Sequence, residues 1–257
     1  MSPISAIARK EIRSYFVSPI AYVVASVFLL LIGLLSFLAV ATAGNRSLQM
    51  LRGQGTLPDL NLNEIIFRPV FYNMAVILLL VVPILTMRLF AEEKKLKTME
   101  LLMTSPITVT DLVVGKFCAV FAVFAGMLAL TAVGPLALAP FAQFQWAPLL
   151  TAYLGVLLMG GLFLSAGLLA SSLTENQIIA VILSFGGLLL LWLFAWAGQV
   201  FADSVAGTVL TYLAPLDHFE RLVKGLVTTS DLVYFMAGIV FMLVLTHRVI
   251  ESQRWRG

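Results

Sequence analysis

Six long apolar stretches alternate with short polar segments along this chain. They cover approximately the ranges Pro19–Ala43, Pro69–Met87, Leu112–Leu138, Pro148–Ser171, Gln177–Val200 and Leu232–His247. A helix that crosses a bilayer needs about 20 mostly apolar residues, and the apolar positions here run continuously instead of alternating as they do in barrel strands. The pattern therefore predicts an all-α polytopic membrane protein, a single domain over residues 1–257 with six transmembrane helices.

The composition also points to the bilayer as the solvent. The chain has 257 residues, of which 61% are hydrophobic and 11% are charged, and this leaves too little polar surface to coat a soluble globule. With the N-terminus placed inside, eleven basic residues fall in cytoplasmic segments and five in outer segments. Basic residues favour the cytoplasmic side, so we expect both termini to be cytoplasmic. The basic residues follow the membrane topology and do not indicate a nucleic-acid partner.

The N-terminal segment has the pattern of a helix that lies on the membrane surface. Ser2 and Pro3 suit the N-cap and the first position of a helix, and apolar residues then recur at helical spacing. Residues 1–18 are therefore predicted to form an interfacial helix, and the alternative is a basic tail without helical structure. The Ser18-Pro19 step is expected to turn the chain into the membrane, because a residue before proline disfavours α geometry.

The segment 201–231 mixes charged and apolar residues between the fifth and sixth spans. This mixture predicts a pair of short extracytoplasmic re-entrant helices, which survive at membrane depth only when they pack against protein. The candidate functional residues of this segment are His218, Phe219 and Arg221. We expect His218 to pack or to form hydrogen bonds within these helices and not to bind a metal.

Two shorter patterns bear on helix packing and helix ends. Gly161 with Ser165, and Gly167 with Ser171, are pairs of small residues that let helices approach closely, and we favour packing over a dedicated dimer surface for them. In the polar turn between the fourth and fifth spans, Thr174 with Gln177 fits a capping box.

The sequence lacks the motifs of most catalytic and metal sites. It has no GxxxxGK[ST] loop, no HExxH, no cluster of His and Cys, and no nucleophile elbow, so no ATP, metal or catalytic site is expected in this chain. When Lys116 is assigned to the cytoplasmic segment, the span interiors hold no Asp, Glu, Lys or Arg, whereas ion-coupled carriers keep such a residue at membrane depth. These absences favour a membrane protein that takes its energy from another subunit.

Charge concentrates in one segment, Arg88–Lys116, with five basic and four acidic residues between two spans. Leu96, Met99, Leu102 and Met103 fall on one helical side, and Ser105-Pro106 ends or redirects that helix. Thr108 with Asp111 then forms a capping box that starts the third span. We predict that residues 88–111 contain a cytoplasmic coupling helix, with Glu92–Met103 moving as one helix; the alternative is an ordinary positive-inside loop.

These residues resemble a known family. The runs Ala91–Lys94, Thr98–Leu102 and Ser105–Ile107 are similar to the intracellular motif of ABC-2 type transporter permeases, in which acidic residues, Gly-Thr and Glu-Leu-Leu precede a small-Pro step. Lys97 stands where that family has the glycine. The Ser171–Gln177 turn resembles the second cytoplasmic turn of the family. Leu216–Phe219 and Asp231–Phe235 are similar to its gliding-motility-associated branch.

The resemblance implies a permease subunit of an ATP-driven complex in a bacterial inner membrane, which exports a substrate or transmits force. It implies a separate ABC ATPase subunit that binds ATP and Mg, a second permease copy (a homodimer), and an auxiliary membrane protein with a large extracytoplasmic domain. We expect Glu92, Glu93 and Glu100 to make charge-assisted contacts with the ATPase. The other candidate coupling residues are Thr98, Leu101, Leu102 and Met103. The candidate residues of the second cytoplasmic turn are Thr174, Glu175 and Gln177.

Two functions of other classes stay open on the sequence. A channel or a secondary carrier would move its substrate without an ATPase. A membrane scaffold for an extracytoplasmic partner would show coupling to an ATPase without any substrate flux.

Overall fold

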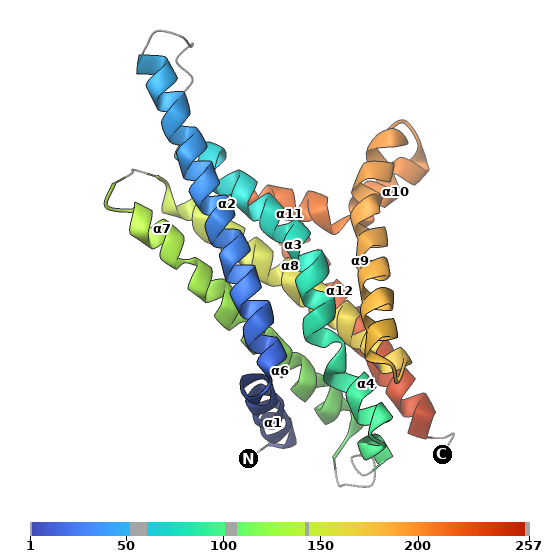
Figure 1. Cartoon of the computed structure of the whole chain (residues 1–257). Coiled ribbons are helices and arrows are strands. Elements are labelled where there is room, and N and C mark those ends of the chain that lie inside the picture. The colour runs from blue at the N-terminus through green and yellow to red at the C-terminus, as the bar shows by residue number, and fades with distance from the viewer. Residues whose placement is uncertain (1, 52–60, 101–106, 142–143, 255–257) are drawn as a thin grey trace.

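The chain folds into a bundle of helices (Figure 1). The computed structural model describes residues 2–51, 61–100, 107–141 and 144–254, and this part of the chain contains no strand. Its helices are α1 (Pro3–Val17), α2 (Pro19–Leu51), the π-helical turn η1 (Asn63–Phe67), α3 (Arg68–Thr86), α4 (Arg88–Lys95), α6 (Val109–Thr131), α7 (Val133–Leu138), α8 (Trp146–Leu173), α9 (Gln177–Val200), α10 (Val205–Leu213), α11 (Pro215–Val223) and α12 (Thr229–Arg254).

The six predicted membrane-spanning segments are confirmed. Each corresponds to a helix, or to helices in continuous succession, that is long and apolar enough to cross a bilayer: Pro19–Gln49, Asn63–Lys95, Val109–Leu138, Trp146–Leu173, Gln177–Val200 and Thr229–Gln253. The first and last of them are longer than the apolar stretches alone suggested. This is because polar residues continue the helix beyond the apolar core at both places.

Helix α8 is the centre of the bundle. It contacts α3, α6, α9, α11 and α12, and Val156, Phe163 and Leu168 along it are fully buried. The neighbouring helices approach α8 so closely that α8 needs small residues where they meet. A Cβ atom on Gly160 would lie 2.2 Å from the Phe124 ring, and one on Gly167 would lie 2.2 Å from Thr86 Oγ1. The small residues of α8 therefore serve packing within the chain.

Helix ends follow the predicted signals at three places and differ at one. Ser2 caps α1, the chain is extended at Ser18, and Thr108 with Asp111 forms the predicted capping box at the start of α6. The box predicted for Thr174 and Gln177 is wrong. Asn176 is the N-cap instead, and its Oδ1 accepts a hydrogen bond from the Ile178 amide at 2.9 Å, because α9 begins later than that box required.

Different helices lie at the two ends of the bundle. Helices α1 and α4 and the C-terminal part of α12 lie at one end, whereas α10 lies at the opposite end (Figure 1). The helix predicted for residues 1–18 is present as α1 and lies at a steep angle to α2 (Figure 1). Its position in the membrane interface stays a prediction. The two short helices predicted for residues 201–231 are present as α10 and α11, and α11 packs on α8 and α9. Their re-entrant position stays a prediction.

Candidate functional site

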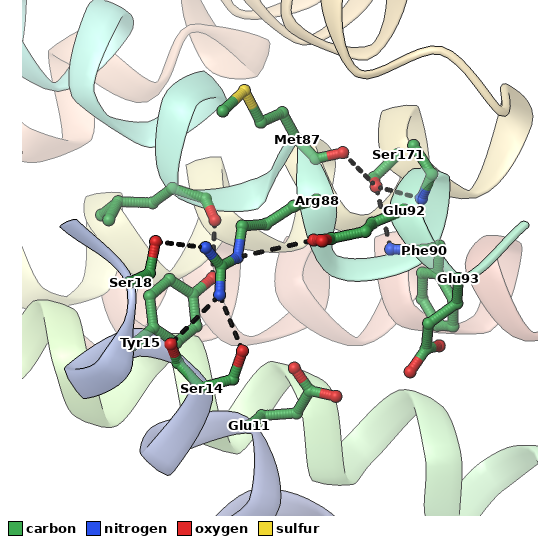
Figure 2. Close-up of polar contacts among 12 residues, drawn as sticks. Glu11, Ser14, Tyr15, Ser18, Met87, Arg88, Phe90, Glu92, Glu93 and Ser171 are labelled. Carbon is green, nitrogen blue, oxygen red and sulfur yellow. Dashed lines mark hydrogen bonds and ion pairs between the residues drawn. The ribbon is translucent and has the colours of Figure 1, made fainter. Parts of the chain in front are cut away.

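The charged end of the bundle contains an opening in the hydrogen-bond ladder between α3 and α4. Ser171 of α8 donates from its Oγ to the Met87 carbonyl at 3.0 Å and accepts from the amides of Phe90 at 3.1 Å and Ala91 at 3.2 Å (Figure 2). In a continuous helix the Ala91 amide would donate to the Met87 carbonyl itself. A side chain inserted into the ladder is a known cause of helix breaks, so Ser171 fixes the junction between α3 and α4.

Arg88, the first residue of α4, joins this junction to α1. Its guanidinium donates to Ser18 Oγ at 2.6 Å and to Ser14 Oγ at 2.7 Å, and it lies 5.2 Å from the centre of the Tyr15 ring. The Tyr15 hydroxyl donates to the Leu85 carbonyl at 2.6 Å. Figure 2 shows Arg88 between the side chains of α1 and the helix start. Helix α4 is thus held by α1 on one side and by α8 on the other.

A cluster of four charges lies beside this contact. Lys116 Nζ lies 2.9 Å from Glu11 Oε1 and 2.9 Å from Glu93 Oε1, and Lys10 Nζ lies 3.0 Å from Glu93 and 3.4 Å from Glu11. Lys116 is 1% exposed. The cluster joins α1, α4 and α6 and balances two positive charges against two negative ones. A buried ion pair costs several kcal/mol when one partner is removed, so these three helices resist separation here.

The neighbouring charges in the cluster shift the pKa values of Glu11 and Lys10. Burial opposes the charged form of Glu11, but Lys116 and then Lys10 outweigh it and hold the pKa of Glu11 below its usual value. Burial likewise opposes the charged form of Lys10, and Glu93 and Glu11 outweigh it and raise the pKa of Lys10. Both groups are therefore charged at neutral pH.

The cluster corrects one expectation from the sequence and adds contacts to another. Lys116 lies seven residues inside α6, a candidate span, so the inference of span interiors without charge is wrong at this residue. Its partners come from α1 and α4, which are remote in the sequence. Glu93 is buried and faces the cluster, with Oε1 in ion pairs and Oε2 without a hydrogen-bond partner in the described part of the chain. Glu93 thus pairs with Lys116 and Lys10 within the chain, and its expected contact with an ATPase stays a prediction.

The coupling helix also ends earlier than predicted. Its C-cap is Leu96, and Lys97 has φ of 55°, the one positive value at a non-glycine position among the described residues. Single left-handed residues of this kind end helices, and glycine favours that conformation. A continuous helix from Glu92 to Met103 is thus wrong, because the helix is interrupted at Leu96 and Lys97 and resumes at Thr98. Leu96 is 63% exposed, whereas Met99 is buried. Leu101, Leu102 and Met103 lie outside the described residues.

The remaining coupling candidates lie around α4. Glu92 keeps 44% of its side chain exposed, and Glu100 is exposed. Thr98 donates from Oγ1 to the Glu93 carbonyl at 3.2 Å, which supports the helix end.

The turn between α8 and α9 also meets α4. Lys94 Nζ donates to the Ser172 carbonyl, and Gln253 of α12 donates to the same oxygen at 3.4 Å. Thr174 accepts from the Asn176 amide, Glu175 is exposed and Gln177 is the first residue of α9. The structure thus brings the two predicted cytoplasmic motifs together through Ser171 and Ser172.

A second polar cluster lies near the opposite end. His218 is buried; its Nδ1 lies 2.7 Å from Asp231 Oδ1 and its Nε2 lies 2.9 Å from the Tyr212 carbonyl. Arg221 donates from Nε to the same carboxylate oxygen at 2.9 Å, and the Tyr234 ring stacks on His218 at 3.9 Å.

Within the described ranges, no three His, Cys, Asp or Glu side chains are placed to hold a metal. Phe219 is fully buried. The role of Asp231 in this cluster was not predicted, although the residues that resemble the family include Asp231.

Comparison with known proteins agrees with this architecture. No curated protein matches the chain. A family model described as "ABC-2 family transporter protein" matches residues 5–250, which include all six candidate spans apart from the last turn of α12, the charged segment and both polar clusters. The chain therefore belongs to the ABC-2 family of transporter proteins, as a membrane permease component that is not itself catalytic.

Proposed function

We propose that this chain is the permease subunit of an ATP-driven complex in which a separate ABC ATPase subunit pushes on α4. The observation that carries the proposal is the attachment of α4 to α1, α6 and α8 at once, through Arg88, Glu93 and Ser171. The partner subunit would bind ATP and Mg, because this sequence lacks a phosphate-binding loop. The energy of hydrolysis then reaches the spans through α4.

The contacts of α4 explain how a push would be transmitted. Moving α4 away from α6 would separate Glu93 from Lys116, and a buried charge without its partner is costly. The three attached helices would therefore move together, while the open ladder at Ser171 allows α4 to change its angle to α3. Rigid elements that turn about a short junction are a common form of conformational change.

The exposed carboxylates of the coupling region are the proposed contacts with the ATPase. Glu92 and Glu100 would form charge-assisted hydrogen bonds to its basic residues, with Thr98 and the turn at Thr174 and Glu175 beside them. The complex would contain a second permease copy and an auxiliary extracytoplasmic protein in a bacterial inner membrane, with both termini cytoplasmic. The excess of basic residues in the segments near α1, α4 and the C-terminus supports the cytoplasmic position of the termini. The second copy and the auxiliary protein rest on the resemblance to the family.

The test is charge reversal at the proposed contact, measured in the assembled complex. Glu100→Lys should lower the ATPase activity that depends on the permease, while the amount of inserted chain is unchanged. Asp203→Lys is the matched control, because Asp203 is also exposed but follows α9 at the opposite end. Equal activity of the two variants, with normal assembly, would contradict the coupling role. Substrate flux in liposomes containing the chain alone, without ATP, would instead identify a channel or carrier.

A further inference from the structure

A polar depression of about 410 Å³ lies between α1 and the start of α4. Its lining combines three basic side chains with two hydroxyl groups and one apolar residue: Lys10, Arg13, Arg88, Ser14, Ser18 and Val17. No carboxylate belongs to the lining in the described part of the chain. Positive charge with hydroxyl donors is the lining that suits a phosphate group.

The two hydroxyl groups have donors to spare. Arg88 donates to Ser14 Oγ and to Ser18 Oγ, so each oxygen already accepts a hydrogen bond. Among the residues that the structure describes, neither hydroxyl donates to a protein acceptor. Each O–H is thus left to donate to a ligand in the depression, since a hydroxyl carries one donor besides its acceptor positions.

The charge on this surface is only partly neutralised. Lys10 is shared by Glu93 and Glu11, and Arg88 Nε lies 3.9 Å from Glu92. Arg13 is exposed and, within the described ranges, has no carboxylate within 4.0 Å. The depression therefore keeps a net positive charge that an anion can neutralise.

The position of the depression indicates that the anion belongs to a lipid. Ser18 is the junction between α1, which lies across the end of the bundle, and α2, the first span (Figure 1). Next to it, Val17 is 76% exposed, Phe16 62% and Ile20 43%. Exposed apolar side chains beside basic ones mark the level at which headgroups meet acyl chains.

We propose that this depression binds the phosphate headgroup of an anionic phospholipid, with its acyl chains against the exposed apolar residues at the α1–α2 junction. Basic surfaces at the cytoplasmic ends of spans recognise anionic headgroups in this way. The phosphate would accept hydrogen bonds from Ser14 and Ser18 and pair with Arg13. Because Arg88 and Ser14 also join α1 to α4, a bound lipid would strengthen the contact between these two helices.

The test titrates the purified full-length chain in detergent with phosphatidylglycerol or phosphatidylcholine and measures retained lipid by native mass spectrometry. Phosphatidylglycerol should bind saturably and more tightly than phosphatidylcholine. Arg13→Gln should weaken its binding roughly fivefold, the effect of one basic residue at an anionic membrane surface. Arg9→Gln is the matched control, because Arg9 is exposed on the same helix but does not line the depression. Ser14→Ala should also weaken binding.

Three results would overturn the proposal. Equal retention of the two lipids would remove the anionic preference. Equal effects of the Arg13 and Arg9 variants would show a diffuse attraction without a site. Displacement of phosphatidylglycerol by millimolar glycerol 3-phosphate would assign the site to a soluble phosphate and not to a lipid. Since none of these measurements uses an ATPase, they are independent of the proposed coupling function.

Discussion

Replacement of Ser171 by alanine tests the junction between α3 and α4 most directly. The substitution removes one hydroxyl that accepts from two buried amides and donates to one carbonyl. An unsatisfied buried polar group costs about 1–3 kcal/mol, and the Ala91 amide can recover the Met87 carbonyl if the ladder closes. With the Met87 carbonyl recovered, the Phe90 amide stays unsatisfied unless it also reaches the Thr86 carbonyl, and we expect Ser171→Ala to lower the free energy of unfolding by about 1–3 kcal/mol.

The matched control is Ser165→Ala on the same helix. Ser165 is also fully buried, but its hydroxyl donates only to the Leu162 carbonyl one turn earlier in α8. We expect this variant to lose about 1 kcal/mol, the net value of one hydrogen bond.

The assays are denaturation in detergent and hydrogen exchange. In the Ser171 variant, the amides of Phe90 and Ala91 should exchange faster, and the Ser165 variant should leave them unchanged. The reasoning is refuted if both variants have the same stability and the same exchange at these two amides.

Two further predictions concern the end of α4 and the charge cluster. Lys97→Gly should stabilise the chain by about 0.5–1 kcal/mol. A non-glycine residue in the left-handed conformation costs about 1–2 kcal/mol, and glycine costs about 0.5–1 kcal/mol in backbone entropy on folding. A lower denaturation midpoint for this variant would contradict the left-handed conformation of Lys97. Glu11→Gln should destabilise the chain at neutral pH. Since the folded pKa of Glu11 lies below its ordinary value of 4.5, the stability that its charge contributes is present above pH 4.5 and is lost as pH falls through the folded pKa. Melting temperatures across pH should therefore converge for variant and wild type on acidification, and a constant difference would contradict the charge pairing.

Helical periodicity and end signals were sufficient for most of the fold. The apolar runs are long and uninterrupted, so the six spans follow from length alone. Ser2, Ser18 and the Thr108–Asp111 box act through neighbouring residues, and local signals of this kind are readable from the sequence. The start of α9 was misplaced because both Thr174 and Asn176 can cap a helix, and the sequence does not rank them.

The candidate site depended on contacts that no local pattern contains. Lys116 looked like part of a charged loop because its partners, Glu11 and Glu93, are 105 and 23 positions away. Its burial follows from the packing of α1 on α6, which requires the tertiary fold. Ser171 looked like a small packing residue, and its hydrogen bonds to the α3–α4 junction likewise require the tertiary fold. The glycine of the family pattern coincides with the left-handed backbone found at Lys97, but this conformation was not predicted from the sequence.

The hydroxyl of Ser171 gives the α3–α4 junction two bonding arrangements of equal number. In the observed one, the amides of Phe90 and Ala91 donate to Ser171 and Ser171 donates to Met87. In a continuous helix the same two amides would donate to the carbonyls of Thr86 and Met87, and the hydroxyl would turn to a carbonyl of its own helix, as Ser165 already does. Met87 has helical dihedral angles in the observed state, φ of −52° and ψ of −35°. Closing this part of the ladder between α3 and α4 therefore exchanges the partners of these groups without the loss of a hydrogen bond among them.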